Sequence, residues 1–200
     1  PEDKSIMGQA MAAFLAAGDV ERAHTLAQVL DHSPENPTLV RALKIASLFK
    51  SKNYQGVLDQ LEIDVVAGPS IDGLLKGWAL MGLGQVSDAL EEFDTVSGSQ
   101  GMQNFSNYQK ALALASVGDF EGADNVLMTK GLAPVTLSSR GRLAYAQILV
   151  QRERRNAATT FLTKIYDDNG DQEVLALISK IRAGANIDFD IITNASEGAG

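Results

Sequence analysis

A short phrase recurs along this chain at a nearly constant interval. A stretch of small and apolar residues leads into a turn, and a second apolar stretch with an alanine then begins. The turn falls at Gly18, Lys52, Gly84, Gly118 and Arg152, so successive copies lie 34, 32, 34 and 34 residues apart. A period of this length, made of a helix, a turn and a second helix, is typical of helical repeat proteins whose units stack on one another. The sequence therefore predicts an all-α solenoid.

Five repeat units follow from these turns. Their predicted bounds are residues 4–36, 38–68, 70–99, 102–133 and 136–168. Gly18, Gly84 and Gly118 are expected to end the first helix of their units, because glycine readily adopts the positive φ found at helix C-termini. The third unit is two residues shorter than the others, and we expect the deletion in the connector before Ser70, where it costs least.

One further helix is predicted after the fifth unit, at residues 171–183. It has a broad apolar face, an N-terminal Asp171 that can cap it, and Gly184 at its end. A single last helix is what an array needs to cover its final repeat. We therefore interpret it as a capping helix.

The tail at residues 185–200 is predicted to be irregular or strand-like. Its apolar side chains, Ile187, Phe189, Ile191 and Ile192, partly alternate with aspartates. Four such side chains in water would each forgo on the order of 1.5–3 kcal/mol of burial. We therefore expect the tail to dock on a repeat surface of its own or a neighbouring chain, or to belong to a following domain. Because the chain begins at Pro1 without a methionine, we expect it to be a piece of a longer protein.

The repeat pattern resembles the tetratricopeptide repeat. In that family the first helix has a small residue, then a large one, and the second helix carries an alanine. The small position maps to Met11, Ile45, Gly77, Ala111 and Tyr145, and the large one to Phe14, Leu48, Leu80, Leu114 and Ile148. The alanine position maps to Ala23, Val57, Ala89, Ala123 and Ala157. The resemblance implies a right-handed α-α superhelix of five helix pairs plus the capping helix. Its degenerate copies are similar to divergent bacterial arrays of exported or envelope-associated proteins, which implies the periplasm or cell envelope.

The same resemblance implies where a partner would bind. In tetratricopeptide arrays five positions of each first helix line a concave groove. The partner-contacting residues carried over are Phe49, Ile71, Leu74, Trp78, Met81, Phe105, Tyr108, Leu112, Arg142 and Leu149. This face is mostly apolar, and Gly8, Ala12 and Ala46 stand where carboxylate-gripping members carry polar side chains. The resemblance therefore implies an apolar peptide, helix or neighbouring domain as partner.

The sequence thus favours a non-catalytic protein–protein interaction scaffold. One alternative is a regulatory or substrate-recruiting arm of a larger enzyme or envelope-assembly protein, with the active part outside this chain. Another is a spacer that associates with copies of itself through the groove or the tail. The resemblance is a fold-level argument, so the choice among these functions is an analogy.

Composition and charge exclude several other classes. The chain is 45% hydrophobic and 21% charged, which is typical of a folded protein. Its formal net charge of -8 argues against general nucleic-acid binding, which requires a basic surface. It contains no cysteine for disulfides or thiolate metal sites, which fits the cytoplasm and the periplasm equally. No apolar run approaches the roughly 20 residues of a membrane span.

Candidate metal and cofactor motifs are weak, and we expect neither a metal nor a cofactor. His24 and His32 lie two helical turns apart, about 12 Å along the axis, which is too far to share an ion. The acidic residues 167–173 depart from a calcium loop because Gln172 replaces the required glycine. The basic cluster of Arg140, Arg142, Arg152, Arg154 and Arg155 is interpreted as a solvated face or a contact patch for an acidic partner.

The missing glycine in the fifth turn generates a first prediction. Repeat arrays open locally, and an end unit with a less favourable turn should open first. In native-state hydrogen exchange, amides in residues 141–168 should exchange faster than those in residues 111–128. Equal protection of the two segments would contradict this expectation.

Overall fold

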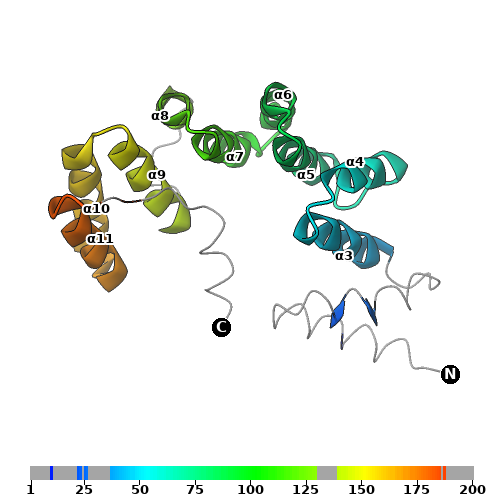
Figure 1. Cartoon of the computed structure of the whole chain (residues 1–200), viewed down its shortest axis with the longest axis horizontal. Helices are drawn as coiled ribbons and strands as arrows, with labels where there is room; N and C mark the ends of the chain where they lie inside the picture. The colour runs from blue at the N-terminus through cyan, green and yellow to red at the C-terminus, as the bar shows by residue number, and fades with distance from the viewer. Residues whose placement is uncertain are drawn as a thin grey trace. The chain divides into compact units, whose positions relative to one another are not determined.

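The computed structural model describes residues 10, 22, 23, 25, 26, 37–129, 139–185 and 187, and every regular element in this part is an α-helix (Figure 1). Most of the first predicted unit, including His24 and His32, lies outside these residues. The described helices are α3 (Pro37–Lys50), α4 (Tyr54–Ile63), α5 (Pro69–Gly82), α6 (Val86–Ser97), α7 (Gln103–Ser116), α8 (Phe120–Thr129), α9 (Ser139–Gln151), α10 (Arg155–Asn169) and α11 (Gln172–Arg182). The predicted all-α class is therefore confirmed.

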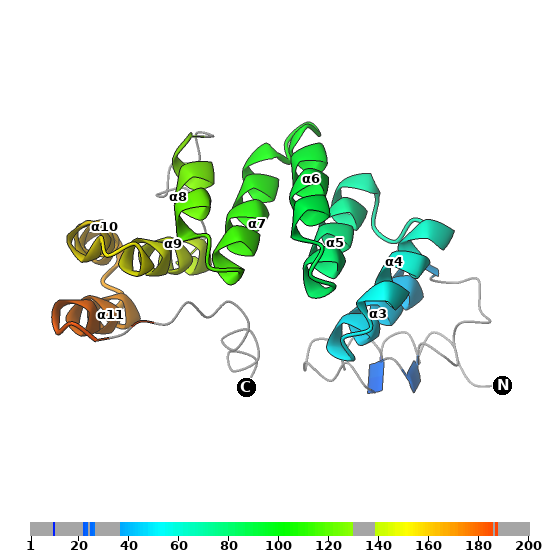
Figure 2. The ribbon, with the colours of Figure 1, turned by 45° about the horizontal axis from the view of Figure 1, so that its top comes forward.

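The helices form two compact units that divide after Val96. In the first unit α3 packs on α4 and α4 on α5, and in the second each helix from α7 to α10 packs on the next one. Figure 2 shows α10 and α11 lying side by side at the end of the second unit. Sequential pairwise packing of this kind is consistent with a helical array.

Within residues 37–129 and 139–185, the first helix of each pair ends in the same hydrogen-bonded turn. One residue adopts a left-handed conformation: Lys52 (φ 57°), Gly84 (φ 77°), Gly118 (φ 84°) and Glu153 (φ 60°). The next amide donates to the carbonyl five residues earlier, from Asn53 to Leu48 (2.8 Å), Gln85 to Leu80 (2.9 Å), Asp119 to Leu114 (2.9 Å) and Arg154 to Leu149 (2.8 Å). These are the bonds of a Schellman motif, which satisfies carbonyls left over at a helix C-terminus.

The predicted turn positions 52, 84 and 118 are confirmed, but position 152 is wrong by one residue. The left-handed residue of the fifth unit is Glu153, so the turns lie 32, 34 and 35 residues apart. Aligned on Glu153, the small position becomes Ala146, the large position becomes Leu149 and the second-helix alanine becomes Ala158. The predictions Tyr145, Ile148 and Ala157 are each one residue early, because an extra residue lies between Leu127 and Ala146.

In the corrected alignment, buried residues fall at the same positions of each repeat. Five residues after each left-handed residue stand Val57, Ala89, Ala123 and Ala158, all fully buried at 0% exposure. Four residues before it stand Leu48, Leu80, Leu114 and Leu149. Seven residues before it stand Ile45, Gly77, Ala111 and Ala146, all buried. The buried positions therefore lie at fixed sequence distances from the left-handed residue, whether or not that residue is glycine.

The short interval between Lys52 and Gly84 arises in α4, which has 10 residues where α6 has 12, whereas the connectors at 64–68 and 98–102 are equally long. The prediction of a deletion in the connector before Ser70 is therefore wrong. Helices α3, α5 and α7 each begin fifteen residues before their left-handed residue, so the two missing residues lie between Lys52 and Pro69. The connector after α4 is held by Asp72, whose carboxylate accepts hydrogen bonds from the amides of Val66 (2.9 Å) and Ala67 (2.8 Å). This places Val66 in a core cluster with Ile45, Val57 and Ala79.

The predicted capping helix is present as α11. Asp171 caps it by accepting a hydrogen bond from the Glu173 amide (2.9 Å), and Gly184 ends it with φ 75°. Its apolar side packs against α10, with Val174, Ile178 and Ile181 buried.

The fifth turn generates a prediction about stability. A residue with a Cβ in the left-handed conformation costs roughly 1–2 kcal/mol, whereas glycine does not incur this cost. Replacing the exposed Glu153 (Glu153→Gly) should raise the free energy of unfolding by up to about 1 kcal/mol, because glycine's freedom in the unfolded chain offsets part of the gain. The reverse change, Gly118→Ala, should lower it by about 1 kcal/mol.

Urea unfolding monitored by circular dichroism measures both effects. Lys52→Gly repeats the stabilising change at an independent turn and should act in the same direction. A lower midpoint for both glycine variants would show that the left-handed residues are not strained.

Candidate functional site

The residues predicted to contact a partner lie 13, 10, 6, 3 and 2 positions before each left-handed residue. We call these residues the groove face. In the first unit they include Phe49 on α3 and Ile71, Leu74, Trp78 and Met81 on α5. Ile71 is 40% exposed, whereas Leu74 is buried. Phe49, Trp78 and Met81 are half-buried, so part of each side chain is accessible.

Two close helix contacts shape this face in the first unit. A Cβ on Gly77 would lie 2.6 Å from the Phe93 ring, and one on Gly82 would lie 2.6 Å from the Tyr54 ring. Glycine at these positions therefore lets both rings pack directly on α5. Trp78 meets Phe93 edge-on at a centroid distance of 5.8 Å. Trp78 is consequently both a face residue and a neighbour of the fully buried Phe93.

In the second unit the groove face begins on α7. Phe105 is 48% exposed, Tyr108 is half-buried and Leu112 is buried. Phe105 occupies the same position in its helix as Ile71 does in α5, thirteen residues before the turn. Large apolar side chains are therefore exposed at equivalent positions in both units.

The corrected alignment changes the groove face on α9. Counted from Glu153, its members are Arg140, Leu143, Gln147, Val150 and Gln151. The predicted Leu149 is instead buried at the position of Leu48, Leu80 and Leu114. Arg142 is half-buried and aligns with Arg41, Gly73 and Asn107. Leu149 and Arg142 therefore do not belong to the groove face, because the extra residue shifts α9 relative to the 34-residue period. For the other eight residues, contact with a partner stays a prediction.

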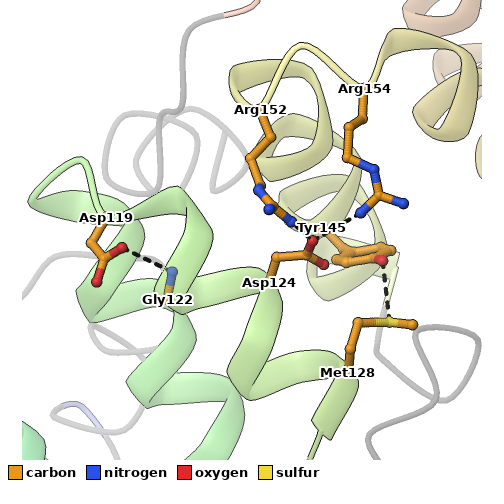
Figure 3. A network of polar contacts seen from close by, with 7 residues as sticks. All are labelled: Asp119, Gly122, Asp124, Met128, Tyr145, Arg152 and Arg154. Atoms are coloured by element: carbon orange, nitrogen blue, oxygen red, sulfur yellow. Dashed lines mark hydrogen bonds and ion pairs between the residues drawn. The ribbon is translucent and has the colours of Figure 1, made fainter.

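A buried carboxylate joins α8 to the next helix pair (Figure 3). Asp124 on α8 is only 3% exposed, and its Oδ2 accepts hydrogen bonds from Arg152 and from Arg154, the latter at 3.0 Å. Arg152 lies in the turn after α9, and Arg154 is the N-cap of α10. The contact therefore links the fourth helix pair to the turn of the fifth. The sequence signal that could have revealed it is an aspartate directly after the fully buried Ala123.

Tyr145 lies beside this ion pair. Its hydroxyl donates to the Met128 sulfur at 3.3 Å, and its ring meets Phe161 edge-on at 5.2 Å. Burial raises the pKa of the Tyr145 hydroxyl, and the positive charge of Arg154 partly offsets this rise. The phenol is therefore neutral near pH 7 and packs as part of the α8–α9 interface.

The arginine cluster is mostly used within the chain. Arg152 and Arg154 bind Asp124, and Arg155 donates to the carbonyls of Ala185 (3.0 Å) and Ile181 (3.4 Å). The interpretation as a solvated face is therefore wrong for Arg152 and Arg155, whereas the side chain of Arg154 stays 51% exposed. The side chain of Arg140 lies outside the described residues.

The described residues contain no group of three or more His, Cys, Asp or Glu side chains that could hold a metal ion. In the acidic segment 167–173, Asn169 accepts from the Asp171 amide (3.0 Å) and Gly170 is left-handed, as expected for a loop between helices. None of the described helices has the length and apolarity needed to cross a membrane.

Comparison with known proteins finds no relative of this chain. No protein-family model, curated protein or solved structure matches the chain. The functional argument therefore depends on the groove face and the contacts described above.

The buried ion pair generates a prediction. Asp124→Asn removes the charge that both arginines share, and we expect the free energy of unfolding to fall by about 1–3 kcal/mol. Thermal or urea unfolding measures this loss. Asp167→Asn is the matched control, since the same change at an exposed position should stay within about 0.5 kcal/mol. Equal effects of the two variants would show that the buried pair contributes no net stability.

Proposed function

We propose that this chain is a non-catalytic protein–protein interaction scaffold whose groove face binds an apolar peptide, helix or neighbouring domain. The proposal includes the finer assignment of the array as a divergent tetratricopeptide type with right-handed superhelical winding. It is supported by turns 32, 34 and 35 residues apart and by the repeated small and alanine positions. The inference from a repeat array to a binding function is an analogy at the level of fold.

The observation that carries the proposal is the exposure of Ile71 and Phe105. Both stand at the same groove-face position, and they are 40% and 48% exposed. Moving such a side chain from water into an apolar contact gains up to about 1.5–3 kcal/mol. Ile71 and Phe105 differ from other exposed apolar residues in belonging to a helix face with further large apolar side chains, and such a grouping favours a binding surface.

The neighbouring residues suit an apolar partner. Phe49, Trp78 and Tyr108 are half-buried aromatic residues, and Met81 adds a flexible apolar side chain. Aromatic side chains provide large contact areas at low cost in conformational entropy, and methionine adapts to irregular surfaces. Binding would therefore be dominated by burial of apolar surface.

A pair of double variants tests this function. Ile71→Ser with Phe105→Ser removes two exposed groove-face side chains without touching the Trp78–Phe93 contact. Captured proteins from an extract of the source cells would be identified by mass spectrometry, and the affinity of each purified candidate measured. Burying each of these side chains against a partner gains up to about 1.5–3 kcal/mol, so affinity should fall at least about tenfold.

The chain offers a closely matched control. Leu83 and Val117 are 39% and 50% exposed, and each directly precedes the left-handed residue of the same two helix pairs, outside the groove face. Leu83→Ser with Val117→Ser should leave affinity within about twofold. If both double variants weaken binding equally, or neither does, the groove face is not the binding surface. Helical circular dichroism checks that each variant is folded.

A further inference from the structure

The chain after α11 returns to the groove face of α9. Arg155 donates to the Ala185 carbonyl (3.0 Å) just after the left-handed Gly184, which holds the start of the tail against α10. Two residues later, the side-chain amide of Gln151 donates to the Ile187 carbonyl. Gln151 is a groove-face residue, two positions before Glu153. The backbone of the tail is therefore already held by the surface proposed for a partner.

The side chain of Ile187 is buried rather than exposed to water. It is only 8% exposed, although it follows the capping helix and belongs to none of the described helices. Its burial shows that this end of the second unit accepts an apolar side chain from the tail. The burial of Ile187 and the hydrogen bonds to the carbonyls of Ala185 and Ile187 together define where the tail first contacts the repeats.

The sequence beyond Ile187 can continue the same contact. In extended backbone, Ile187, Phe189 and Ile191 would share one face, because side chains alternate every two residues. Residues 187 to 191 would then span about 13 Å, at roughly 3.3 Å per residue. The distance along α9 from Gln151 back to Leu143 is about 12 Å, at 1.5 Å per residue. The apolar residues of the tail therefore match the groove-face positions of α9 in length.

We propose that residues 187–192 of the chain act as an intramolecular ligand that docks on the groove face of α9, starting from the contacts of Ala185 and Ile187. The segment competes with an external partner because it occupies the same surface, at the high effective concentration of a tethered ligand. This regulation rests on the proposed function, whereas the docking itself does not require it.

The absence of cysteine makes the docking directly testable in the full chain. Gln147→Cys combined with Phe189→Cys places one thiol on the groove face and one in the tail. Under a mild oxidant the intramolecular disulfide should form at least tenfold faster than in the control Asn156→Cys with Phe189→Cys. Asn156 is exposed and follows Arg155, so an undocked tail would reach it as readily as Gln147. Peptide mapping identifies the crosslink.

Equal rates in the two pairs would overturn the docking, as would a disulfide that links two chains instead of one. Regulation is then tested with the partner identified by capture. The oxidised Gln147–Phe189 pair should bind it at least threefold more weakly than the same protein after reduction. If oxidation leaves binding unchanged, the tail does not compete with the partner. If the protein binds the partner in neither state, the proposed function is overturned instead. In both cases the crosslink rate still decides whether the tail docks.

Discussion

The left-handed turn between paired helices is the constraint on which the rest of this structure depends. It ends the first helix, satisfies its last carbonyls and directs the chain back so that the second helix packs beside the first. The hydrogen-bond pattern is the same whether the residue is Gly84, Gly118, Lys52 or Glu153. Because the turn is set by backbone geometry, the buried alanine five residues later and the leucine four residues earlier fall at fixed places around it.

The sequence was sufficient to predict most of this framework. Gly84 and Gly118 are direct evidence of a left-handed position, and Lys52 followed from the period and from Asn53 after it. The capping helix followed from Asp171 and Gly184. At the fifth turn there is no glycine, and Ala157 and Ala158 are equally plausible as the buried alanine. The period alone then placed the turn one residue early.

The candidate site was less predictable for a physical reason. Which face of a helix is accessible depends on the neighbouring helices as well as on its own register. Leu74 and Leu112 fit the groove pattern, yet both are buried, whereas Ile71 and Phe105 are exposed. The pairing of Asp124 with Arg152 and Arg154 joins residues about thirty positions apart, so the aspartate after Ala123 indicates a buried carboxylate but does not identify its partners.

The position of the extra residue in the fifth unit has a consequence for how such an array can change length. Each residue added within a helix turns everything after it by about 100° around the helix axis, since one turn contains 3.6 residues. The extra residue lies before Ala146, and the two missing residues of the third unit lie before Pro69, so in both cases the buried positions up to the next turn keep their spacing. Length changes toward the end of a second helix or in the connector after it thus leave the buried residues around the next turn at unchanged distances from that turn. Repeats of unequal length can therefore keep the same spacing of buried residues around their turns.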